Sequence, residues 1–259
     1  MNEYKKYGLS FVEMETLDKD AAFLVSKELI QELFCNMAKL CTKYSNSLFY
    51  DLPYSYTERR LDSVLLPTLS KICDSMVTTE APTYRHFHSS NKFVGSDSYG
   101  RIDYWCIYKG YSFVIELKQS FDCFLSDNTR TRLRKSWKKM NEQLFTIEND
   151  VRQYTELTKG VIRIGLHIIT SYSDKEPSKI LIDKYKDKIS SIIERLPSQV
   201  IKIDGKNFPS LKPNILIGWV IPDKIVLDER ALETIPGIWA MAKVLPPIQH
   251  SGYKKSMLL

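Results

Sequence analysis

The sequence predicts an α/β fold, with a mixed central β-sheet flanked by helices. Amphipathic helical stripes alternate with short apolar runs along the chain, which is typical of this class. Residues 161–170 form a nearly continuous apolar run, as expected for a strand covered on both faces. Residues 102–108 and 111–118 are joined by Lys109-Gly110, a two-residue hairpin turn. These features predict helix, three strands, helix and strand, in that order.

Composition excludes several classes of protein. The chain has 259 residues, of which 43% are hydrophobic and 26% charged, so it is too apolar to be disordered. No apolar stretch approaches the ~18 residues of a membrane span and none resembles a signal segment, so we expect a cytoplasmic protein without membrane contact. The 5 cysteines form no C-x-x-C pair, which argues against a zinc site or a disulfide framework. The net charge of +6 permits a polyanionic partner.

The N-terminal part of the chain is expected to contain two helices. Residues 18–44 carry an apolar stripe at helical intervals, which predicts a packing face. A second helix is expected from Ser55, because the segment from Ser55 to Glu58 has the S-x-x-E form of a capping box. Pro67 is expected to kink this helix. The first stripe consists of Phe23, Ile30, Phe34, Met37, Cys41 and Tyr44.

The remaining elements follow from similar patterns. A helix whose apolar stripe begins at Trp137 is expected to end at Gly160, because glycine commonly terminates helices. The chain then divides into a helical extension (1–50), an α/β core (51–225) and a C-terminal helical tail (226–259) packed on the core. Further expected elements are a strand at 84–94, a helix at 178–196, strands at 200–203 and 215–221, and a short helix at 230–244.

Two acidic residues are expected to face each other in the hairpin. If residues are counted outward from the turn, Asp103 lies opposite Glu116. The Cβ atoms of two such residues are about 4.5–5.5 Å apart. Lys118 shares their face, because strand side chains alternate. Two such carboxylates repel, so either one stays protonated or a cation lies between them, and Mg²⁺ suits a site rich in oxygen. The alternatives are a surface hairpin with scattered charges or a buried structural Glu–Lys pair.

The sequence Asp103, followed thirteen residues later by Glu116-Leu117-Lys118, resembles the D…(D/E)-x-K core of the PD-(D/E)XK, or restriction-endonuclease-like, nuclease superfamily. The element order expected over 55–171 is similar to the common core of that superfamily. The resemblance implies a restriction-endonuclease-like core in which Asp103, Glu116 and the carbonyl of Leu117 bind Mg²⁺, with Mn²⁺ as a substitute. Lys118 would assist the attacking water. The resemblance identifies no subfamily, and a proline that often precedes the aspartate is replaced by Ile102.

Many members of the superfamily carry a further acid on the helix before the sheet, and Glu58 is the candidate for this metal-site residue. It lies at the start of the apolar stripe of its helix and is expected to lean toward the sheet. A role in the capping box would explain it equally well. Asp62, one turn later on the same helix face, competes with it.

A basic cluster follows the hairpin and predicts contacts to a phosphate backbone. The alternative is a solvated helix face, although basic residues are disfavoured at a helix start. Arg59, Arg60 and Arg101 are expected to add phosphate contacts from neighbouring elements. The cluster consists of Arg130, Arg132, Arg134, Lys135, Lys138 and Lys139.

The function expected from these observations is metal-dependent hydrolysis of phosphodiester bonds, with DNA as the foremost substrate. Asp103 and Glu116 would hold the metal, and Lys118 would orient a metal-activated water for in-line attack. One such site cuts one strand, so cutting both strands favours a homodimer or a partner protein of a multi-component system. The alternative is a non-catalytic module that binds nucleic acid or protein and retains the fold.

Overall fold

The structure is a computed structural model and describes most of the predicted core. Among the described residues, no helix is both long and apolar enough to cross a membrane. The predicted helix at 178–196 lies outside the described residues. These residues are 9–13, 20–45, 53–55, 57–74, 77–85, 98–123, 131–147, 158–173, 201–203, 206–208, 213–220, 226–228 and 233–248.

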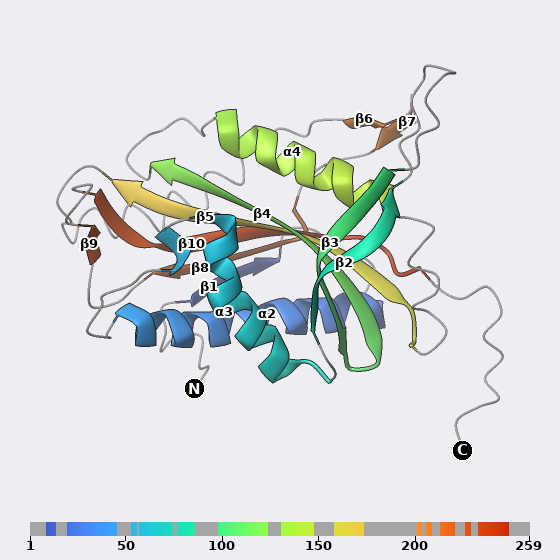
Figure 1. Ribbon diagram of the computed structural model, residues 1–259, viewed down its shortest axis with the longest axis horizontal. Helices are drawn as coiled ribbons and strands as arrows, with labels where there is room; N and C mark the ends of the chain where they lie inside the picture. Colours follow the sequence, from blue (N-terminus) through green and yellow to red (C-terminus); the bar gives the residue numbers. More distant parts are fainter. Residues whose placement is uncertain are drawn as a thin grey trace.

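The described elements form an α/β fold around a mixed sheet of eight strands (Figure 1). The strand order is β1-β8-β10-β5-β4-β3-β2, with β9 paired to β10. Strands β4 and β5 are parallel, and every other pair in the sheet is antiparallel. The sheet strands are β1 (Leu9–Glu13), β2 (Thr78–Arg85), β3 (Ser98–Tyr108), β4 (Tyr111–Cys123), β5 (Val161–Ser173), β8 (Ile215–Val220), β9 (Val226–Asp228) and β10 (Glu233–Val244), and β6 (Ile201–Ile203) and β7 (Lys206–Phe208) form a separate ribbon.

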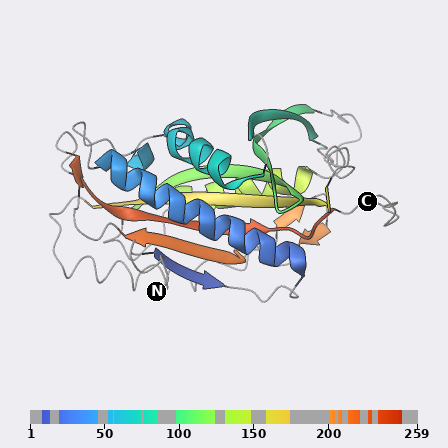
Figure 2. The same ribbon diagram turned by 90° about the horizontal axis from the view of Figure 1, so that it is seen from below.

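Helices cover both faces of the sheet. Helices α2 (Ala21–Ser45) and α3 (Glu58–Ile72) lie on one face, and α4 (Thr131–Thr146) lies on the other (Figure 1). A short 3₁₀ helix, η1 (Pro53–Ser55), precedes α3. Seen from below, α2 lies across the strands (Figure 2). The predicted mixed α/β architecture is therefore confirmed, as are the helix at 18–44 and the strand at 161–170, which correspond to α2 and β5.

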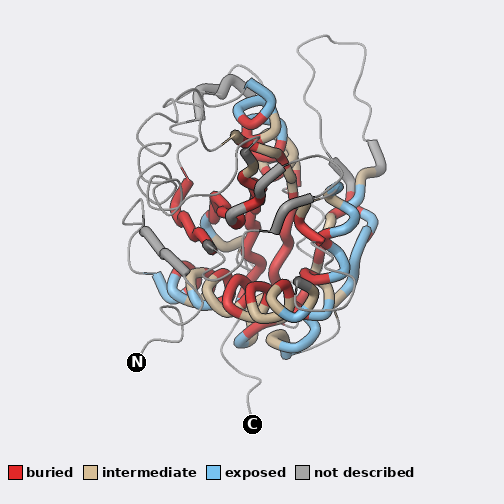
Figure 3. Tube along the Cα trace, turned by 90° about the vertical axis from the view of Figure 1, so that its left-hand side faces the viewer, coloured by how far each residue is buried: buried red, intermediate tan, exposed pale blue. Residues whose placement is uncertain are grey.

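The hydrophobic core lies between the sheet and its helices, and buried segments occupy the interior (Figure 3). Alternation along β4 divides its side chains between the two faces. Phe113, Ile115 and Leu117 pack with α2 and α3, whereas Val114 packs on the other side with Ile147, just beyond α4. Because both faces are covered, Glu116 lies in a strand with almost no access to water.

The predicted helix at 230–244 is wrong, because this segment forms β10 between β5 and β8. Its side chains are buried on both faces of the sheet, so the segment reads as a continuous apolar run rather than an alternating one. Such a run cannot be distinguished from a buried helix by periodicity. The expected C-terminal helical tail is therefore corrected to a central strand over Glu233–Val244.

Two boundaries differ from the predictions, and one strand was not predicted. Strand β2 runs from Thr78 through Pro82 to Arg85, so the strand expected at 84–94 overlaps it only at its first two residues, and 86–94 lie outside the described residues. Proline is tolerated there because β2 is an edge strand of the sheet. The helix expected to reach Gly160 is described only to Thr146. Strand β1, which pairs with β8, was not predicted.

Candidate metal and phosphate site

The candidate site lies where β3 separates from β4. The predicted hairpin pairing is confirmed from Tyr108↔Tyr111 to Tyr104↔Ile115. The ladder ends there, so the predicted direct pair of Asp103 with Glu116 is not formed. Two opposed carboxylates would repel one another, and the strands separate at this position. Beyond it, β4 pairs only with β5 among the described residues.

The Asp103 side chain bridges the two strands where their ladder ends. Its Oδ2 accepts a hydrogen bond of 2.6 Å from the backbone N–H of Leu117. If the β3–β4 ladder continued, a backbone carbonyl of β3 would accept this N–H. The Asp103 carboxylate oxygen accepts it instead. Asp103 points at the peptide group that joins Glu116 to Leu117, so it reaches the part of β4 at which the sequence placed the site.

Glu58 reaches the same edge of β4 from the start of α3. Its Oε2 accepts a hydrogen bond of 3.0 Å from the backbone N–H of Gln119. The predicted capping box is wrong: Thr57 is the N-cap, no side chain caps the helix, and Ser55 lies in η1. Glu58 is the first residue of α3 rather than its third, and its side chain reaches the sheet, as the sequence predicted.

The Lys118 side chain lies among three oxygen atoms. Its Nζ donates a 2.6 Å hydrogen bond to the carbonyl of Leu117. It also lies 3.7 Å from Oε1 of Glu116 and 3.8 Å from Oε1 of Glu58. The structure thus brings together the predicted residues Glu58, Glu116, Leu117 and Lys118, and Asp103 fixes the backbone between them.

Burial determines how these charges interact. The side chain of Glu116 is 2% exposed and that of Lys118 is 17% exposed, so their attraction is weakly screened by solvent. Burial raises the pKa of Glu58, while the charge of Lys118 and the N–H of Gln119 oppose this rise. The lysine therefore offsets the cost of keeping two carboxylates close together.

The oxygen atoms at this site are of the type that binds hard divalent cations. Two carboxylates and a backbone carbonyl already surround one positively charged group, and oxygen is the ligand that Mg²⁺ prefers. Within the described part of the chain, no three His, Cys, Asp or Glu side chains are close enough to hold a metal ion. The cation that these oxygens share in the structure is the Lys118 ammonium.

A buried polar layer lies beside Lys118 on the α4 side of the sheet, and the sequence analysis missed it. His167, on β5, is the Cα partner of Lys118. Its ring stacks on Trp137 at 6.2 Å, and its Nε2 lies 2.9 Å from Oγ of Ser120. Burial, with a smaller contribution from Lys118, lowers the pKa of His167 from 6.5 to about 3. Both members of the Ser120–His167 pair are inaccessible, so it is not a nucleophilic dyad.

Asp62 lies beside the site rather than in it. It accepts a short hydrogen bond from the hydroxyl of Tyr104 on β3. Burial raises the pKa of Tyr104, and the bond to Asp62 raises it further. Of the two acids that competed in the sequence, Glu58 therefore contacts β4 and Asp62 is held by a tyrosine.

The predicted phosphate-binding residues are distributed on several surfaces. Arg101 forms an exposed ion pair with Glu80 at 3.1 Å, and Arg59 is exposed in the first turn of α3. Arg130 lies outside the described residues. The exposed basic residues of α4 share a helix that packs on β4 and β5. They are Arg132, Arg134, Lys135, Lys138 and Lys139.

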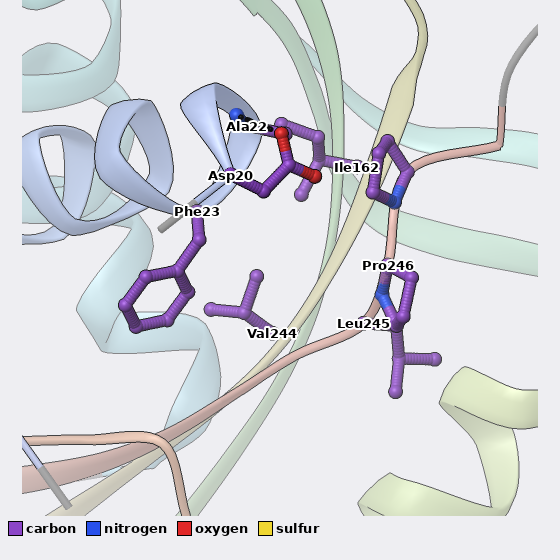
Figure 4. A pocket seen from close by; sticks show the side chains of 8 residues that line it. Asp20, Ala22, Phe23, Ile162, Val244, Leu245 and Pro246 are labelled. Carbon is purple, nitrogen blue, oxygen red and sulfur yellow. Dashed lines mark hydrogen bonds between the residues drawn. The ribbon is translucent and has the colours of Figure 1, made fainter. Parts of the chain in front are cut away.

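A separate cavity of about 190 Å³ lies at the start of α2 (Figure 4). Its lining is mostly apolar, and its single carboxylate, Asp20, accepts a hydrogen bond from the N–H of Ala22. Because no set of polar groups converges in it, the cavity has no part in the chemistry considered below. The lining residues are Asp20, Ala22, Phe23, Ile162, Val244, Leu245, Pro246 and Pro247.

Comparisons of the chain with family models, curated proteins and solved structures found no match.

Proposed function

We propose that this protein is a metal-dependent nuclease that hydrolyses phosphodiester bonds, with DNA as its substrate. The observation that carries the proposal is the convergence of Glu58, Glu116 and the Leu117 carbonyl on the Lys118 ammonium. The convergence lies at a strand edge left by β3, next to Asp103. A hard cation and a phosphate are the partners that such oxygens and such a lysine are suited to bind.

The roles of the chain's own residues follow from these contacts. Glu58 and Glu116, with the Leu117 carbonyl, would hold Mg²⁺ or Mn²⁺, and the hydrogen bond that Asp103 accepts from the Leu117 N–H keeps that peptide in place. When bound, the metal supplies activation of water and neutralisation of phosphoryl charge. Lys118 would then donate hydrogen bonds to the negative charge that develops on the phosphoryl oxygens.

The element order supports a restriction-endonuclease-like core for this proposal. Helix α3, strands β2, β3 and β4, helix α4 and strand β5 follow one another between Glu58 and Ser173. This is the order expected from the superfamily resemblance. The exposed basic face of α4 would follow the phosphate backbone next to the site. Cutting both strands of a duplex would require a second copy of the site, from a homodimer or a partner protein.

A non-catalytic nucleic-acid-binding module is the second candidate. It is favoured by one observation, namely that Lys118 already satisfies the carbonyl of Leu117 and neutralises the neighbouring carboxylates. An ion-pair cluster with a purely structural role would make the same contacts without a metal ion. The two functions differ in whether divalent cations bind at the carboxylates and whether any substrate is cut.

The test is a cleavage assay with purified protein and Mg²⁺ or Mn²⁺ on linear, circular and single-stranded DNA and on RNA. We expect Asp103→Ala and Lys118→Ala each to reduce cleavage by at least about 100-fold, because the first removes the acceptor that holds the Leu117 peptide and the second removes the ammonium at the site. Glu28→Gln is the matched control, since Glu28 is an exposed acid on α2 that pairs with Lys109. Folding of each variant is checked by circular dichroism.

Cleavage by both folded variants at the wild-type rate would refute the assignment. Cleavage that persists in EDTA would refute the role of the metal. If no substrate is cut and no divalent cation binds, the non-catalytic module becomes the better description.

A further inference from the structure

Strand β4 holds the start of α3 at two points, and both involve Gln119. The backbone N–H of Gln119 binds Oε2 of Glu58, as described above. Its side-chain Nε2 donates a 2.9 Å hydrogen bond to the carbonyl of Tyr54 in η1. One residue of the sheet therefore holds both the first acid of α3 and the turn that leads into that helix.

Thr170 completes this attachment from β5. Its Oγ1 donates a 2.5 Å hydrogen bond to the same carbonyl of Tyr54 and accepts one of 3.3 Å from Nε2 of Gln119. We call these three groups, the Tyr54 carbonyl, the Gln119 amide and the Thr170 hydroxyl, the Tyr54 clamp. Thr170 and Tyr54 are fully buried, so water does not compete for the bonds between them.

The ring of Tyr54 is also fixed. It packs edge-on against Trp219 of β8, with ring centroids 5.7 Å apart. Its position is thus set by three strands of the sheet, and only three residues separate it from Glu58. The short connection between Tyr54 and the first residue of α3 transmits this position to the Glu58 carboxylate.

We infer that Gln119 and Thr170 are positioning residues for Glu58. Their side chains contact the Tyr54 carbonyl and each other rather than the Glu58 carboxylate. They fix the start of α3 so that the Glu58 carboxylate lies at the edge of β4 beside Lys118. This inference rests on the proposed function, because it assigns Glu58 to the divalent-cation site.

The experiment measures binding of MgCl₂ and MnCl₂ to the full chain by isothermal titration calorimetry, without any substrate. Thr170→Val removes the hydroxyl and keeps the shape, so we expect affinity to fall by about 10–100-fold, as for other groups that orient a metal ligand. Thr170→Ser keeps the hydroxyl and should restore the wild-type affinity. Gln119→Leu is a second variant at a partly exposed position, and it should weaken binding similarly.

A double-mutant cycle separates positioning from a general loss of structure. In a Glu58→Gln background, Thr170→Val should have no further effect on affinity, because the carboxylate that it positions is absent. An undiminished effect in that background would overturn the inference, as would failure of Thr170→Ser to restore affinity. Wild-type affinity in Glu58→Gln, or in both Thr170→Val and Gln119→Leu, would also overturn it.

The outcome for the wild-type chain is informative separately. If wild type binds a divalent cation and clamp variants bind equally well, only the role of the Tyr54 clamp fails. If wild type binds neither Mg²⁺ nor Mn²⁺, the proposed function fails and the positioning role fails with it.

Discussion

At the scale of single residues, Glu58 shows how the same side chain can be expected in two roles. Its sequence context fits a capping box, yet in the structure its carboxylate accepts an N–H from β4 rather than one from its own helix. The outcome depends on where α3 begins: with Thr57 as the N-cap the capping box is lost, whereas the predicted lean of Glu58 toward the sheet is confirmed. A short motif does not contain that information.

His167 is a residue whose importance only the structure reveals. In the sequence it lies in an apolar run and no partner for it can be identified. In the structure it is fully buried, stacks on Trp137 and faces Ser120. It remains neutral because a charged imidazole in this position would lose its hydration and lie near Lys118.

The pKa of His167 predicts how stability depends on pH. In the unfolded chain the residue takes up a proton near pH 6.5, whereas in the folded chain it stays neutral down to about pH 3. The associated stability is present above pH 6.5 and is lost as the pH falls toward 3. Between about pH 7.5 and about pH 5, we expect wild type to lose about 2 kcal/mol more stability than His167→Gln.

Urea unfolding of the two proteins at both pH values measures this difference directly. Contributions of other ionisable groups are common to both proteins and cancel. Equal losses in wild type and His167→Gln would mean that His167 is protonated in the folded protein as readily as in the unfolded chain.

At the scale of elements, β3 and β4 show how far the rules of pairing extend. The two-residue turn at Lys109-Gly110 set the register, and both turn residues have positive φ, as such turns require. The register persists to Tyr104↔Ile115 and then ends. The turn determines which residues are opposite, but the length of the ladder depends on what the strands meet further on, here the carboxylates and α3.

Helix α4 combines a buried stripe with an exposed basic face. The buried residues pack on β4 and β5, and Met140 and Leu144 lie so close to Gly165 that a Cβ at this position would approach Met140 Cε to 2.7 Å. The helix therefore lies tightly on β5, which is the neighbour of β4, the strand that carries Glu116 and Lys118. Its basic residues are in consequence held at a fixed distance from the candidate site.

This arrangement predicts the salt dependence of DNA binding. Neutralising Lys135 and Lys139 together should reduce the slope of log affinity against log salt by about 2, because each phosphate contact contributes about 1. The measurement is fluorescence anisotropy of a labelled duplex at several salt concentrations. Neutralising Lys43 and Lys71, in the last turns of α2 and α3, removes the same charge elsewhere and serves as the control. An equal change in both double variants would show that only net charge matters.

At the scale of the whole molecule, β10 is the element that changes the predicted architecture most. The sequence predicted a helical tail here, but the strand lies in the middle of the sheet and pairs with β5 and β8 along most of its length. Its register shifts between Thr234 and Gly237, a stretch that contains Pro236, and a bulge is where a central strand tolerates proline. Strand β10 is thus integral to the core.

The central position of β10 makes a prediction for stability. Ile238 is 0% exposed, so Ile238→Ala should lower the free energy of unfolding by about 2–5 kcal/mol. Leu24 on α2 is 49% exposed, and Leu24→Ala should cost less than about 1 kcal/mol. Urea unfolding gives both values. Equal small losses would contradict a central position for this strand.

Features that depend on neighbouring residues could be predicted from the amino-acid sequence. The alternation of strands, the hairpin register near its turn and the shared face of Glu116 and Lys118 all follow from local geometry with a period of two. The apolar stripe of α2 and the buried run of β5 followed in the same way from local periodicity.

Tertiary structure alone decided where these elements meet. The contact between Glu58 and Gln119 joins residues 61 positions apart, and β10 takes its place by pairing with β5 on one side and β8 on the other. The separation of β3 from β4, the start of α3 and the burial of His167 depend on similar distant contacts. Such contacts gain their energy from burial and from hydrogen bonds between distant segments, which local spacing does not encode.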